Sequence, residues 1–235
     1  MGPSHSHSLF DSKAVRAAFI TKVFTIVFVQ CLIATAVIAF FTFHDPTKQF
    51  LRNNEGWQLG IMLICLVVVM VIMITISCYP SVARNYPCNF VLLFILTIGF
   101  ALIASMAAVR YETVTVLCAF GATAISVLVL VLAAHLCPVD LTTCGLTFLI
   151  LGLVHFIICL ILCLTLTDVK ALHLIIGSTG ALLVSLYMIM DVQLIMGGRT
   201  HELSPEDYVL GAMLLYADII NLFMYMLMIF GAARD

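Results

Sequence analysis

Charged residues are scarce in this chain. Lys, Arg, Asp and Glu make up 9% of its 235 residues, the formal net charge is −2, and no long basic or acidic run occurs. Binding to nucleic acid, or strong attraction to an anionic lipid surface, needs a concentration of positive charge that this sequence does not have. We therefore expect no nucleic-acid partner.

The chain also has none of the common hydrolase motifs. It contains no G-x-S-x-G, no H-E-x-x-H and no phosphate-cradling glycine loop. Its nine cysteines form no CxxC and no Cys/His spacing suited to zinc, so we interpret them as small apolar side chains. A disulfide between Cys137 and Cys144 is conceivable, but we disfavour it because we expect that loop in the cytosol. We expect no enzymatic activity and no cofactor.

Apolar residues are abundant instead. They make up 64% of the chain, and the mean hydropathy is +1.22. A membrane-spanning helix needs about 20 apolar residues. Cutting the sequence at its charges and prolines leaves seven such runs, approximately Thr21–Phe43, Leu59–Tyr79, Asn89–Val109, Thr113–His135, Leu141–Thr167, Ala171–Met196 and Tyr208–Ala232.

These runs predict an all-α integral membrane protein, a seven-helix bundle surrounded by the lipid bilayer. We expect residues 1–18 to form a short polar tail and residues 19–235 a single transmembrane domain, with no amphipathic surface helix. Seven spans place the two termini on opposite sides of the membrane. Lys13, Arg16 and Lys22 crowd the first span and favour a cytosolic amino terminus, although the ten cations of the whole chain then divide evenly, five on each side.

Two acidic residues, Asp191 and Asp218, lie inside the last two apolar runs. An ionised carboxylate at hydrocarbon depth costs at least ~2.5 kcal/mol, so such residues usually have a function. A short loop makes the two helices antiparallel neighbours, so the carboxyl groups can face each other. Asp191 lies about one turn from its helix end and Asp218 nearer mid-membrane, and this offset requires tilt, an irregular helix end or a shared aqueous cavity.

If these carboxyl groups meet, like charge and burial both oppose ionising the two together, and the pair can sense protons. When deprotonated, they offer the hard oxygen ligands that calcium prefers. The structural alternative is that each aspartate only hydrogen-bonds a neighbouring helix. An intramembrane aspartyl protease also carries two such aspartates, but the Gly-x-Gly-Asp context of its second one is missing around Asp218.

Two further charged residues are candidates for the same function. Arg84 could latch the second span to the sixth or seventh through one of these aspartates, or could simply be a cytosolic topology charge. Glu112, on the opposite side, could gather cations at an entrance, or could form a solvated pair with Arg110.

Capping signals separate the last two helices. Gly197 can end the sixth helix in a left-handed conformation. Ser204 suits an N-cap, Pro205 the first helical position, and Asp207 the position that completes a capping box. We therefore explain Asp207 by capping alone.

Six segments of the chain share a pattern with a known family of membrane proteins, and they are Phe19–Phe24, Asn85–Asn89, Val139–Cys144, Met190–Gly198, Ser204–Tyr208 and Ala217–Phe223. Together they resemble the Bax inhibitor motif family, specifically its lifeguard branch. The resemblance implies a seven-helix fold with a central last helix, in Golgi or endoplasmic reticulum membranes, that passes calcium down its gradient and restrains apoptosis. It also implies that the family's pH-sensing pair corresponds to Asp191 and Asp218. One departure is Val114, where many members carry an acid.

The resemblance and the two aspartates together favour a pH-gated calcium leak channel. Two alternatives remain open. The chain could restrain cell death by binding other membrane proteins, such as apoptosis regulators or calcium-release channels. It could also be a proton-coupled cation exchanger, although no inverted repeat is visible.

Overall fold

The computed structural model describes residues 13–166 and 168–234, and within these ranges it contains helices and no strand. The seven predicted spans are confirmed as helices long and apolar enough to cross a membrane. Their bounds are α1 Lys13–Phe43, α3 Glu55–Cys78, α5 Cys88–Ala108, α6 Thr113–Leu136, α7 Gly145–Thr165, α8 Val169–Met196 and α9 Tyr208–Arg234. The first helix thus begins inside the expected polar tail, of which residues 1–12 lie outside the described part.

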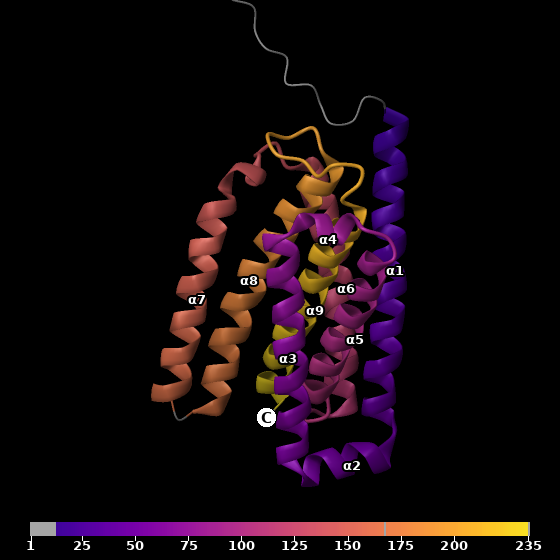
Figure 1. The fold of residues 1–235 in the computed structure, drawn as a ribbon. Coiled ribbons are helices and arrows are strands. Elements are labelled where there is room, and N and C mark those ends of the chain that lie inside the picture. Colours follow the sequence, from indigo (N-terminus) through magenta and orange to yellow (C-terminus); the bar gives the residue numbers. More distant parts are fainter. Residues whose placement is uncertain (1–12, 167, 235) are drawn as a thin grey trace, which may run out of the picture.

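Short helices connect these spans at both ends of the bundle. They are α2 Asp45–Asn53, α4 Pro80–Arg84 and the 3-10 helix η1 Leu141–Cys144. We call the end that holds α4, η1 and the start of α1 the α4 end, and the opposite end the α2 end (Figure 1).

The expectation that no amphipathic surface helix exists was wrong, because α2 is one. It lies across the α2 end of the bundle (Figure 1), with Lys48 and Leu51 buried and Phe50 exposed. His44 precedes this helix, and its Nδ1 accepts the Thr47 N–H at 3.4 Å. A helix of nine residues is too short to stand out as a hydropathic run, and the His44-Asp45-Pro46 cap resembles a simple chain break.

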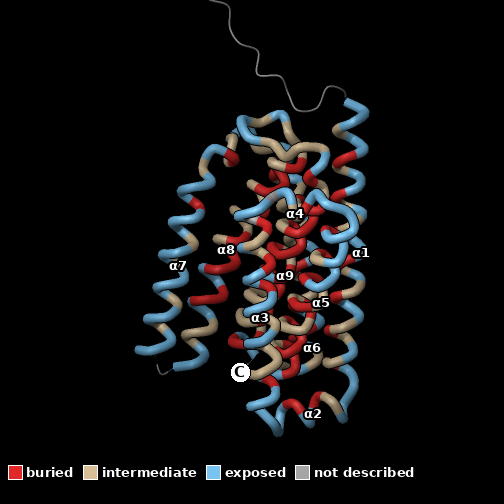
Figure 2. The backbone as a smooth tube through the Cα atoms, in the orientation of Figure 1, coloured by how far each residue is buried: buried red, intermediate tan, exposed pale blue. Residues whose placement is uncertain are grey.

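The last helix, α9, forms the centre of the bundle. It contacts α8, α6, α1 and α5, and 50% of its most apolar stretch is buried. In α7 the corresponding fraction is 6%, and this helix packs mainly against α8 and η1. Figure 2 shows the difference as a largely buried α9 and a largely exposed α7 at the edge. The exposed apolar face of α7 is suited to contact with lipid.

The connection between α8 and α9 differs in part from the prediction. Gly197 ends α8 with φ +68°, the region that favours glycine, and its N–H bonds the Gln193 carbonyl at 3.0 Å. The helix expected to begin at Pro205, with Ser204 as its N-cap, begins instead at Tyr208. Ser204 opens a turn in which its carbonyl accepts the Asp207 N–H at 2.9 Å, and the Asp207 carbonyl then accepts the Gly211 N–H at 2.9 Å.

Candidate functional site

Asp191 and Asp218 lie together between α8 and α9. Asp191 is 6% exposed and Asp218 is 7% exposed. Their carboxyl groups lie close enough to interact with each other. The two intramembrane carboxyl groups singled out from the sequence therefore form one buried cluster.

The register of the two helices explains how residues at different distances from the helix ends can meet. Gly211 of α9 lies beside Ile195 of α8. Counting into the bundle from that level, Asp218 lies seven residues forward along α9 and Asp191 lies four residues back along α8. The difference of three residues corresponds to about 4.5 Å along the helix axis. Side chains lean toward the amino terminus of their own helix. In antiparallel helices the two carboxyl groups therefore lean toward each other.

The surroundings of the pair are apolar. One turn away on α8 lie Met188 and Ile195, and one turn away on α9 lie Leu215 and Leu222, all of them members of one buried cluster with residues of α1 and α6. Two carboxyl groups can hydrogen-bond each other only when at least one carries a proton. A proton held between the two groups would meet this condition, and Asp218 Oδ2 has no hydrogen-bond partner among the described residues.

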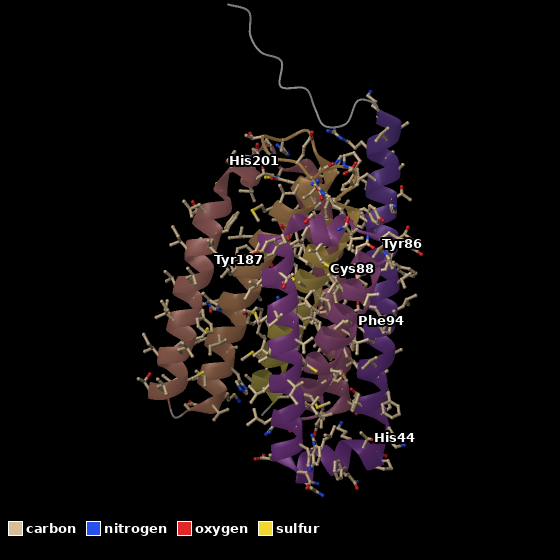
Figure 3. The ribbon with its side chains drawn as sticks, viewed as in Figure 1. His44, Tyr86, Cys88, Phe94, Tyr187 and His201 are labelled. Atoms are coloured by element: carbon tan, nitrogen blue, oxygen red, sulfur yellow. The ribbon has the colours of Figure 1, made fainter. Side chains whose placement is uncertain are left out.

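Tyr187 connects this site to the peripheral helix α7. It lies one turn before Asp191 on α8, and its hydroxyl donates to the Phe148 carbonyl of α7 at 2.6 Å. Gly152 of α7 makes room for the phenol, because a Cβ there would lie 2.4 Å from the Tyr187 hydroxyl oxygen. Figure 3 shows Tyr187 along α8 on the side of α7.

The loop at residues 197–207 closes the α4 end above the pair. Asp140 holds it through one carboxylate oxygen that accepts the Thr200 N–H and hydroxyl at 2.9 and 2.7 Å. The other oxygen accepts the Thr142 hydroxyl at 2.6 Å and its N–H at 3.0 Å. These hydrogen bonds, led by the one from the Thr142 hydroxyl, hold the pKa of Asp140 well below its usual range. His201, labelled in Figure 3, lies in the same loop.

Two more contacts hold this loop in place. Arg16 of α1 pairs with Glu202 at 3.3 Å, and the Glu202 carboxylate also accepts the Gly198 N–H at 2.8 Å. Gln193, only 1% exposed, joins α8 to the start of η1, since it accepts the Leu141 N–H and donates to the Val139 carbonyl, each at 2.9 Å. Sequence reasoning missed Asp140, Gln193 and Glu202. Only Gln193 gave a signal in the sequence, because it is a polar residue in an apolar run, two positions after Asp191.

Arg84 does not contact the intramembrane pair. Its guanidinium binds Asp207 through two hydrogen bonds of 2.7 and 3.0 Å. The expected partner of Arg84 was therefore wrong, because α4 places it at the bundle surface where α9 begins. The same contact shows that capping alone does not explain Asp207, whose side chain is 9% exposed. A link between the second span and the last helix therefore exists, but it runs through Asp207 instead of Asp191 or Asp218.

Glu112 lies at the α2 end, far along the bundle from the aspartate pair. Its side chain is 75% exposed and approaches Arg234 at 3.7 Å. Arg110, its expected partner, pairs with Glu55 at 3.3 Å instead. Among the residues that the structure describes, no group of three or more His, Cys, Asp or Glu side chains gathers to hold a metal ion. In the described part of the chain, Asp191 and Asp218 are therefore not joined by a third side chain of these types that could complete a metal site.

Comparisons with known proteins agree with the resemblance in the sequence. Residues 16–235 match the family described as "Inhibitor of apoptosis-promoting Bax1". Mouse lifeguard 3 is 32% identical over 228 residues, which are 96% of this chain and 72% of that protein. Human lifeguard 3 is 32% identical over 94% of this chain and 71% of its own length. Mouse lifeguard 4 is 31% identical over 91% and 84%. With its seven membrane-spanning helices and these matches over nearly its whole length, the chain belongs to the Bax inhibitor family.

Proposed function

We propose that this protein is a pH-sensitive, calcium-permeable leak channel of intracellular membranes, gated by Asp191 and Asp218. The observation that carries the proposal is the proximity of two buried carboxyl groups on adjacent helices. Calcium is the transported ion, and the carboxylate oxygens are its candidate ligands on the way through.

The proposed gate uses the proton between the two carboxyl groups. With the proton in place, the hydrogen bond holds α8 against α9 and the path is closed. Loss of the proton leaves two like charges, which repel each other by about 4 kcal/mol at 4 Å and an effective dielectric constant of 20. A term of that size can reverse a two-state equilibrium. The helices then separate, and the carboxylates become available to a cation.

The direction of gating follows from proton linkage. The closed form binds one more proton than the open form, so lowering the pH favours the closed form and raising it favours the open form. We therefore propose that calcium flux increases with pH across the range in which the pair loses its proton.

Arg84 and Asp207 have a separate role in this proposal. Their two hydrogen bonds hold α4, and with it the second span, to the residue just before α9. Any opening that moves the start of α9 must either break this contact or move α4 together with α9. We assign it the role of a latch that favours the closed form, and we assign Glu112 no more than attraction of cations at the far entrance.

The cellular setting is also part of the proposal. We place the protein in Golgi or endoplasmic reticulum membranes with its amino terminus in the cytosol, where a leak would lower stored calcium and restrain apoptosis. The family description, which names inhibition of an apoptosis-promoting protein, supports the last point. Apoptosis regulators or calcium-release channels would then be its protein partners.

Calcium flux into proteoliposomes between pH 5 and pH 8 tests the gate. The native chain should pass more calcium at the higher pH. Asp191→Asn and Asp218→Asn should each abolish the pH dependence, because an amide donates a hydrogen bond to the remaining carboxylate without needing a shared proton. Asp140→Asn is the matched control, since Asp140 stays ionised throughout this range, and it should keep the native pH profile.

Other results would favour other functions. No flux at any pH would rule out the channel and leave the partner-binding regulator. Uphill calcium uptake driven by a pH gradient alone would identify an exchanger. A native pH profile in both aspartate variants would make Asp191 and Asp218 packing residues.

A further inference from the structure

An apolar groove on the outer surface of the bundle, between α1 and α5, has no part in the proposed gate. It has a volume of about 280 Å³, and its lining lies within residues 25–33 of α1 and 90–97 of α5. The groove therefore follows each helix for about 10–12 Å. Val29 and Phe94 of its lining are 49% and 59% exposed. A long, open, apolar groove in a membrane-spanning bundle suits a hydrocarbon chain.

The polar residues of the lining direct their donors to the protein. Gln30 Nε2 donates to the Thr97 hydroxyl at 2.9 Å, and that hydroxyl donates to the Leu93 carbonyl at 2.7 Å. The Thr25 hydroxyl donates to the Thr21 carbonyl at 2.7 Å. The other atom of the Gln30 amide, Oε1, is buried, so a molecule in the groove does not reach it. The surface that the groove offers to a ligand is therefore apolar.

Aromatic residues surround the end of the groove that is nearer the α4 end. The Phe90 ring, which is part of the lining, meets the Tyr86 ring edge-on with centroids 6.2 Å apart. It also lies 6.4 Å from the ring of Tyr208, the first residue of α9. Figure 3 shows Tyr86 toward the α4 end and Phe94 further into the bundle, both on the side of α1. Tyrosine is enriched where membrane hydrocarbon meets water, so this end of the groove lies at the depth of lipid headgroups.

A cation lies at the same end of the groove. Lys22 of α1 is one helical turn before the lining residues Thr25 and Ile26, on the same face of the helix. Its Nζ is 3.3 Å from the centre of the Tyr208 ring. The side chain is exposed, and none of the ion pairs in the described part of the chain includes it. An ammonium group has three N–H donors, so those turned away from the ring can bind an anion.

Two carboxylates, those of Glu206 and Asp207, come directly before Tyr208 in the chain. Asp207 binds the Arg84 guanidinium through both of its oxygens. These hydrogen bonds raise the pKa of Arg84, and the charge of the exposed Glu206 adds to the effect. Both carboxylates therefore have Arg84 as their cation, and Lys22 keeps its charge for a ligand.

We propose that this groove binds an acidic phospholipid of the leaflet at the α4 end, with one acyl chain between α1 and α5 and its phosphate on the Lys22 ammonium. The Tyr208 ring holds the ammonium in place before the lipid binds, which lowers the entropy cost of binding. An acidic headgroup is favoured over a zwitterionic one, because the zwitterion brings a further cation close to Lys22 and Arg84. Basic pockets between membrane helices are typical sites for lipid headgroups.

Native mass spectrometry of the full-length chain tests the headgroup site, with phosphatidylglycerol as the acidic lipid and phosphatidylcholine of the same acyl chains as the zwitterionic one. The native chain should retain phosphatidylglycerol more strongly. Lys22→Gln should weaken this retention about tenfold, the usual loss for a charged hydrogen bond, and so remove most of the preference. Lys13→Gln is the matched control, because it removes another cation of α1, and it should change neither lipid's retention.

Filling the groove tests the place of the acyl chain. Val29→Trp puts a large ring into the groove and should weaken the retention of both lipids. Leu32→Trp is its control, because Leu32 is 54% exposed on the same helix but lies outside the lining, and it should change neither. Both positions are on the exposed surface of α1, so neither ring has to enter the core of the bundle.

Three results would overturn the proposal. The first is equal retention of the two lipids by the native chain, and the second is equal weakening by Lys22→Gln and Lys13→Gln. The third is equal behaviour of Val29→Trp and Leu32→Trp, which would place the acyl chain elsewhere. Displacement of both lipids by cholesterol in the native chain but not in Val29→Trp would make the groove a sterol site instead.

Discussion

At the scale of single residues, the loop over the aspartate pair depends on a carboxylate that the sequence did not single out. Asp140 accepts hydrogen bonds from Thr142 on one side and Thr200 on the other. Because its pKa is depressed in the folded protein, it stabilises the fold at pH values above the unfolded value of about 3.9. That contribution is lost as the pH falls through the lower folded-state pKa.

Asp140→Asn should therefore destabilise the protein by a constant amount, about 1–2 kcal/mol after allowance for solvent screening, from pH 5 to pH 8. The difference from the native chain should shrink in strong acid. Thermal unfolding in detergent at several pH values measures this. Thr142→Val removes a donor to the same carboxylate, so the double variant should lose little more than Asp140→Asn alone. Additive losses would show that the two residues act independently.

At the scale of elements, the α8–α9 interface holds the pair because the two helices approach closely below it. A Cβ on Gly180 would lie 2.3 Å from the Tyr225 ring of α9, and one on Gly177 would lie 3.2 Å from the Tyr225 carbonyl oxygen. Small residues of this kind let helix backbones approach in membranes, where packing rather than the hydrophobic effect drives association.

Gly180→Ala should force α8 away from α9 and destabilise the protein by about 1–3 kcal/mol, the usual range for overpacking. Gly121→Ala on α6 is the matched control, because a Cβ there meets nothing within 4 Å. The control should be neutral or stabilising by up to about 1 kcal/mol, since alanine favours helix more than glycine does. The thermal-unfolding midpoint of each variant measures its effect on stability. Equal decreases in the midpoint for Gly180→Ala and Gly121→Ala would contradict a special role for the α8–α9 contact.

At the scale of the whole molecule, seven spans place the two ends of the chain on opposite faces of the membrane. α1 begins at the α4 end, and α9 ends at the α2 end (Figure 1). A tag fused to the amino terminus should be digested by protease added to sealed intracellular membranes, whereas a tag at the carboxyl terminus should survive until detergent is added. The reverse pattern would invert the proposed orientation, and accessibility of both tags would contradict an odd number of spans.

The fold class and the two aspartates at the centre of the candidate site can be predicted from the amino-acid sequence. Seven apolar runs of spanning length leave little choice but a helical membrane bundle. Asp191 and Asp218 stood out because carboxyl groups inside such runs are costly. Both signals are local, so each can be recognised without knowing what lies beside it.

Which polar groups are partners depends on how the helices pack in the folded protein. Arg84 binds Asp207 rather than the intramembrane pair, Glu112 approaches Arg234, and Asp140 holds Thr200 across 60 residues of sequence. The register between α8 and α9, set by packing at Gly211 and Ile195, brings Asp191 and Asp218 within reach. Burial at hydrocarbon depth is a property of one segment, whereas hydrogen-bond partners depend on how the helices pack, which hydropathy does not encode.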